Sequence, residues 1–104
     1  MHRSPELEEL VAHWFAAATA GDVSVVDTAV AAHPGVCLIG SDPGEWFRGG
    51  AAVAQFLRGE VTNAGGRARF SPAGTEAFEE STVGWATTRL TITLTRRSTH
   101  LTAM

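Results

Sequence analysis

A long segment near the C-terminus alternates between apolar and polar side chains, and this alternation constrains the fold more than any other feature. Within residues 82–95, the apolar Leu90, Ile92 and Leu94 are separated by threonines. Successive side chains of a β-strand point to opposite faces, so the segment is predicted to be a strand with one buried face. Its many β-branched residues favour the same structure. Such a strand needs neighbouring strands and a layer that covers its apolar face.

Helical signals come earlier in the chain. Ser4 and Pro5 predict the start of a helix, whose apolar positions recur at helical spacing until Gly21 stops it. Asp22 is predicted to cap a second, short helix that ends before His33. A third helix is predicted between two later pairs of glycines, because its apolar residues also share one face.

Short strands are predicted around these helices. Because helices come first and strands last, we expect an α+β fold, with helices packed in a mostly antiparallel sheet. A continuous apolar run indicates a buried strand, and turn residues separate the others. The predicted short strands cover residues 36–39 (the buried one), 45–48, 67–71, 75–80 and 99–104.

Composition narrows the class of protein. The 104 residues fit a single domain over residues 1–104 and carry a net charge of −3. Scattered arginines on an acidic chain do not favour nucleic-acid binding, and no apolar run reaches the length of a membrane span. The first nine residues lack a signal-peptide pattern, and one cysteine cannot form an internal disulfide. We therefore expect a cytoplasmic protein.

The chain resembles a known family. The phrase IGSDPGEWFRG at residues 39–49, the opening helix, the junction at Gly21 and the helix with Phe56 resemble the SnoaL-like branch of the nuclear-transport-factor-2-like superfamily. The resemblance spans roughly residues 6 to 102. It implies a cone, in which a strongly curved sheet wraps the N-terminal helix around a pocket. Relatives include steroid isomerases, epoxide hydrolases, polyketide cyclases and non-catalytic domains, so the fold alone does not choose an activity.

The chain departs from the catalytic patterns of these relatives. Steroid isomerases use a tyrosine, which is absent here, and a carboxylate at a position that falls on Gly40 or Ser41. Epoxide hydrolases pair carboxylates through an arginine, but Arg89 has threonine neighbours in sequence. The chain is also about one strand shorter than family members usually are. We therefore expect an open or shallow pocket, or an edge near His100 that a dimer partner completes.

Large apolar side chains are the candidate lining of that pocket. Three tryptophans in a small, alanine-rich chain are typical of a small-molecule cavity, although an ordinary core is the alternative. We expect the core to depend on tryptophan and phenylalanine. The predicted pocket residues are Trp14, Ile39, Trp46, Phe56, Trp85 and Leu90.

Two ionisable residues are candidates for acid–base catalysis. Asp42 would be a general base at the pocket rim, or would simply build a turn before Pro43. His100 would be a proton shuttle, or an ordinary edge-strand histidine. Cys37 is interpreted as a small buried hydrophobe. The histidines lack metal-ligand spacing, so neither a metal nor another cofactor is expected.

Three functions remain open. The first is a non-catalytic domain that binds a small apolar molecule. The second is a cofactor-independent isomerase, hydratase or polyketide-cyclase-like enzyme using Asp42 or His100. The third is a homodimerisation module, because the resemblance implies sheet-to-sheet dimers. The predicted dimer face consists of Thr87, Arg89, Thr91, Thr93 and Thr95.

Overall fold

The alternating C-terminal segment is a strand, and it pairs with long and short antiparallel neighbours. The computed structural model describes residues 1–96 and 99–103, with side chains through residue 94. The main sheet has the order β1-β4-β5-β6, and a second sheet contains β2 and β3. The elements are β1 (His2–Arg3), α1 (Pro5–Ala20), α2 (Ser24–Ala29), β2 (Cys37–Ile39), β3 (Trp46–Arg48), α3 (Gly50–Ala64), β4 (Ala68–Glu80), β5 (Val83–Arg96) and β6 (Thr99–Ala103).

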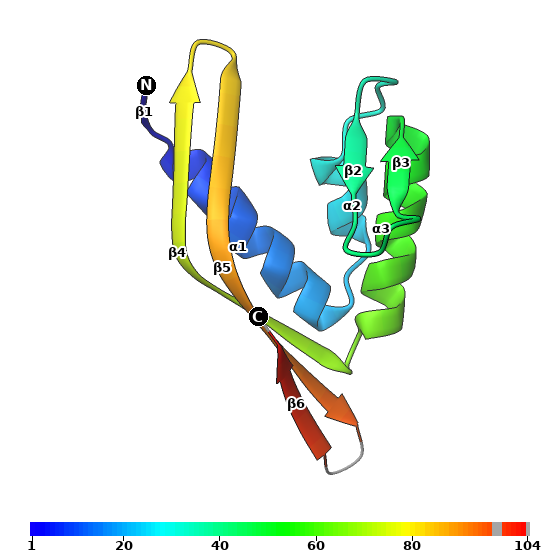
Figure 1. The fold of residues 1–104 in the computed structure, drawn as a ribbon. Coiled ribbons are helices and arrows are strands. Elements are labelled where there is room, and N and C mark those ends of the chain that lie inside the picture. The colour runs from blue at the N-terminus through cyan, green and yellow to red at the C-terminus, as the bar shows by residue number, and fades with distance from the viewer. Residues whose placement is uncertain (97–98, 104) are drawn as a thin grey trace.

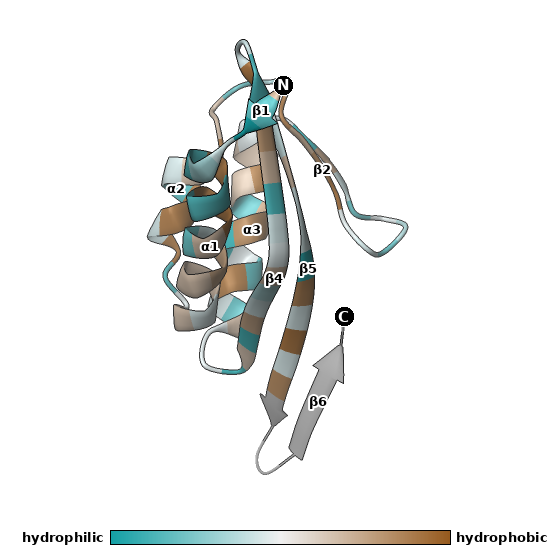
Figure 2. Ribbon diagram, turned by 90° about the vertical axis from the view of Figure 1, so that its left-hand side faces the viewer, coloured by the Kyte–Doolittle hydropathy of each residue, from teal (hydrophilic) through white to brown (hydrophobic). Residues whose placement is uncertain are grey.

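The predicted α+β class is confirmed. All three helices lie on one side of β4 and β5 (Figure 2). The hairpin of β2 and β3 lies beside α3, apart from the main sheet (Figure 1). The pairings within both sheets are antiparallel.

The sequence signals around α1 are confirmed. The Ser4 hydroxyl accepts a hydrogen bond from the Leu7 amide at 3.3 Å, while the Ser4 amide donates to the Ala77 carbonyl at 2.9 Å. Gly21 closes the helix with a left-handed φ of 74°, which glycine adopts without strain. One buried serine thus caps the helix and fastens it to β4.

Two predicted strands, 67–71 and 75–80, are wrong as separate elements because they form the single strand β4. Between Ala73 and Glu76 the register shifts by one residue, which is a β-bulge. Gly74, at φ 63°, supplies the left-handed conformation. β1 pairs with β4 only near Phe78, so at Pro72 this side of β4 has no neighbouring strand in the described chain. Proline, which has no amide proton to donate, is tolerated at such an edge. The turn residues therefore bend the strand without ending it.

Small side chains dominate the core. The buried cluster consists of alanines and valines from all three helices, and Val26 is completely buried. The expectation that tryptophan and phenylalanine would carry the core is wrong: Trp46 and Trp85 are 57% and 42% exposed. Trp14 and Phe70 pack only against the margin of the cluster. Because the small residues bring the helices close together, the large rings remain at the edges.

The strand at residues 36–39 was predicted to be buried, and this is wrong. In the hairpin of β2 and β3, Leu38 and Phe47 are half-buried, and the Phe47 ring stacks on Phe56 of α3 at 4.3 Å. The opposite face is exposed and includes Cys37 and Ile39. A two-stranded hairpin with one covered face leaves every second side chain in solvent.

Candidate functional site

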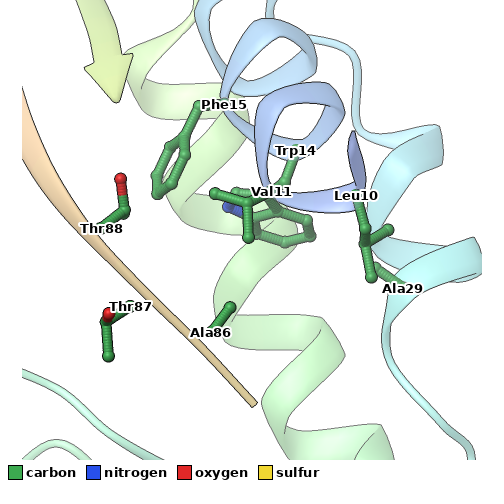
Figure 3. Close-up of a pocket in the computed structure, with 8 residues that line it drawn as sticks. All are labelled: Leu10, Val11, Trp14, Phe15, Ala29, Ala86, Thr87 and Thr88. Carbon is green, nitrogen blue, oxygen red and sulfur yellow. The ribbon is translucent and has the colours of Figure 1, made fainter. Parts of the chain in front are cut away.

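A cleft of about 280 Å³ lies between α1 and β5. Leu10, Val11, Trp14 and Phe15 form its α1 wall, because residues three to four apart share one helix face. Figure 3 shows this wall facing β5, from which Ala86 and Thr88 point toward the helix. The remaining lining residues are Ala29 of α2 and Thr87 of β5.

The space exists because small residues of β5 and α2 face large residues of α1. Closer to the N-terminus of the helix, Leu7 approaches the sheet so tightly that a side-chain carbon built on Gly84 would lie 2.5 Å from its Cδ1 atom. Farther along, the small side chains of Ala86 and Ala29 line the cleft opposite Trp14, and the gap between the two layers remains open. β6 pairs with β5 only from Ile92 onward, so no strand of the described chain covers β5 beside this gap.

Hydroxyl groups provide most of the polar character of the cleft. The Thr88 hydroxyl lies 2.8 Å from the Thr75 hydroxyl and donates to the Ala73 carbonyl at 3.3 Å. Thr87 borders the cleft from the other face of β5 (Figure 3). None of the lining residues in the described part of the chain is ionisable. The cleft therefore favours contact with an apolar molecule over transfer of a proton.

Of the predicted pocket residues, Trp14 lines the cleft. Ile39 and Trp46 are a cross-strand pair on the exposed face of the β2–β3 hairpin. Phe56 stacks on Phe47 beneath the same hairpin. The structure thus places three predicted residues around the hairpin, away from the lining of the cleft.

The other predicted pocket residues are on β5. Trp85 pairs with Phe78 of β4, and the two rings lie 6.4 Å apart on the sheet face opposite α1. Leu90 is on the same face of β5 as Ala86 and is half-buried opposite Pro72. Neither residue lines the cleft, and a role in ligand binding stays a prediction for both.

Of the two predicted catalytic residues, the structure describes the side chain of Asp42 alone. Asp42 is exposed in the turn between β2 and β3, where its carbonyl and its amide both bond to Glu45. The side chain of His100 lies outside the described residues. Cys37 was predicted to be buried and is exposed, because it is on the uncovered face of β2. Acid–base roles for Asp42 and His100 stay predictions.

Sequence reasoning missed most of the lining. Leu10, Val11 and Phe15 belong to the apolar helix pattern that predicted α1, but that pattern does not distinguish a buried face from a cleft. Ala86 and Thr88 share the face of Leu90 by simple alternation, and this signal would have found them. Alanine carries no chemistry of its own, so only the fold reveals that it leaves space.

Two carboxyl groups outside the cleft have lowered pKa values. The Ser24 hydroxyl and amide donate to Asp22 at the start of α2 and lower the pKa of that carboxyl. The His2 ring, 2.9 Å from Glu79, and Ser4 lower the pKa of Glu79 at the β1–β4 edge. Both carboxylates stabilise the ends of secondary-structure elements, which is a structural role.

Among the described residues, no group of three side chains is arranged to hold a metal ion, and no helix is long and apolar enough to cross a membrane. Neither the curated proteins nor the solved structures include a match to this chain. A family model described as "SnoaL-like domain" matches residues 7–104. The chain therefore belongs to the SnoaL-like domain family, within the nuclear-transport-factor-2-like superfamily.

Proposed function

We propose that this domain binds a small apolar molecule in the cleft between α1 and β5. The observation that carries the proposal is the combination of two aromatic side chains, Trp14 and Phe15, with a lining that holds no ionisable group in the described chain. Apolar clefts with a few polar atoms are the usual composition of small-molecule sites. The family implies that the sheet curls around α1, and the bulge in β4 supports such curvature.

An enzyme acting in this cleft would need a titratable side chain beside its substrate. Asp42 does not line the cleft, and Thr87 and Thr88 supply only hydroxyl groups. The isomerase, hydratase and cyclase alternatives therefore have less support than binding alone. The expected cytoplasmic location stays a prediction.

Binding is tested with a fluorescent apolar probe and a matched pair of variants. Anilinonaphthalene sulfonate should bind the wild type and lose binding in Ala86→Phe, because the new ring fills the cleft. The control is Ala16→Phe, which places the same ring on the exposed face of α1. Equal probe binding by wild type and Ala86→Phe would refute the site.

Trp14 provides a second, local signal. The other tryptophans, Trp46 and Trp85, are replaced by phenylalanine so that Trp14 is the only indole left. A ligand in the cleft should then change the emission of Trp14, since this ring forms part of the wall. Unchanged emission at saturating probe would place the probe elsewhere.

A homodimer formed through the sheet face opposite α1 is a second candidate function. Trp85 and Val83 expose 42% and 61% of their surface at one end of β5, as expected for an interface. Arg89 and Glu76 provide both signs of charge on the same face, so two copies related by a twofold axis could pair them. Sedimentation velocity should show a dimer that Trp85→Glu dissociates. A monomer at all concentrations would rule out this candidate.

A further inference from the structure

A second cavity shares Trp14 and Phe15 with the cleft. It has a volume of about 180 Å³ and is lined by α1, α3 and the beginning of β4. Because these two residues line both spaces, the cavity and the cleft are adjacent. Its other walls include Leu57, Glu60 and Ala64 of α3 and Phe70 of β4.

Packed elements hold the walls of this second cavity in place. The Thr19 hydroxyl accepts a hydrogen bond from the Phe70 amide at 2.9 Å and donates to the Phe70 carbonyl at 3.5 Å, which fixes β4 on α1. The Phe15 and Phe70 rings lie 6.3 Å apart. At the C-terminal ends of the helices, a side-chain carbon on Gly21 would lie 3.2 Å from the Gly65 Cα atom. The helices therefore approach as closely as glycine permits.

Neither space alone reaches the usual volume of a small-molecule site. Small-molecule sites usually begin at about 300 Å³. The cleft alone is slightly smaller than this, and the second cavity is smaller still, but together they exceed it. An elongated molecule that extends past Trp14 would use both.

The charge of the lining residues indicates which terminal group such a molecule would carry. Glu60 is the only ionisable residue that lines either space in the described chain. Arg58, two residues earlier in α3, is paired with Asp27 of α2. A carboxylate at the rim attracts an amine and repels a carboxylate of the ligand.

We propose that Trp14 and Phe15 divide a single two-compartment site, and that its ligand is an elongated apolar molecule with an amine end directed at Glu60. This inference depends on the proposed function, because it extends the same cleft. Trp14 and Phe15 are then the residues that set ligand length, and Glu60 is the residue that selects the terminal group.

The length claim is tested with hexylamine and decylamine as probes, using the variant that retains only Trp14. Each buried methylene is worth about a fourfold gain in affinity, so four more give about 200-fold at most. We expect decylamine to bind at least tenfold more tightly than hexylamine. In Ala86→Phe, which fills the cleft, decylamine should fall to the affinity of hexylamine, whereas Ala64→Phe, which fills the second cavity beside Glu60, should weaken both amines. If Ala64→Phe does not fold, Ala64→Leu places a smaller side chain in the same cavity.

The charge claim uses Glu60→Gln with decylamine and decanol as probes. The wild type should prefer the amine by about two- to fivefold, the range of an exposed ion pair, and Glu60→Gln should abolish this preference. An unchanged preference would overturn the role of Glu60.

The outcomes separate this inference from the proposed function. If decylamine binds and is weakened by Ala86→Phe but not by Ala64→Phe, the cleft stands and the second compartment is refuted. If neither amine nor anilinonaphthalene sulfonate binds the wild type, both proposals fail.

Discussion

Thr19→Val removes one hydroxyl from the contact between α1 and β4 and tests whether this contact holds the two layers together. In the wild type the Thr19 hydroxyl accepts the amide of Phe70 at 2.9 Å, in a partly buried position. Valine has nearly the same shape, so the packing is retained while the Phe70 amide loses its partner. A donor left without a partner costs about 1–3 kcal/mol when buried, and we expect about 1–2 kcal/mol here because the site is only partly buried.

Thermal unfolding followed by circular dichroism measures this cost. For a domain of this size, 1 kcal/mol corresponds to roughly 4–8 °C in Tm, so Thr19→Val should unfold roughly 4–15 °C lower. Thr62→Val is the matched control, because Thr62 is on the exposed side of α3. If Thr19→Val and Thr62→Val have the same Tm, the hydroxyl does not hold β4 on α1, and the walls of the second cavity lose their stated support.

Further predictions concern glycine and pH. Gly50→Ala should destabilise the domain strongly, because its Cβ would overlap the Ala31 carbonyl oxygen. Gly59→Ala meets open space and should raise the free energy of unfolding by about 0.5–1 kcal/mol through helix propensity. Urea unfolding measures the change in the free energy of unfolding for each variant. The pKa of Glu79 is lower when folded than its ordinary value of 4.5, so its stabilising effect is complete above pH 4.5 and is lost as the pH falls through the folded pKa. His2→Ala should reduce this acid dependence in unfolding experiments between pH 3 and 6, and an unchanged profile would contradict the assignment.

Local chemistry predicted much of the fold. Ser4, Pro5 and Gly21 mark the ends of α1 because caps and left-handed residues depend only on nearby atoms. The alternation around Ile92 predicted β5 because successive side chains of any strand point to opposite faces. The bulge in β4 was missed because a glycine at a positive φ serves a turn and a bulge equally well, and only pairing with β5 decides between them.

The candidate site was much harder to predict. Trp14 was recognised as a large apolar residue at a helical position, and it lines the cleft. Trp46 and Trp85 have the same chemistry, yet tertiary packing places them on the hairpin and on the opposite sheet face. The free volume depends on Ala29 and Ala86, whose contribution is the absence of a side chain. No residue type signals such an absence, so the cleft follows from the fold.

Methyl NMR of the alanine-labelled domain during titration with anilinonaphthalene sulfonate tests the central claim most directly. Ala29 and Ala86 line the cleft from two elements, while Ala51 is exposed on α3 and provides a reference. The account predicts saturable shifts of the Ala29 and Ala86 methyl signals, with the Ala51 signal unchanged. Saturable binding that leaves the Ala29 and Ala86 signals in place would contradict a ligand site between α1 and β5.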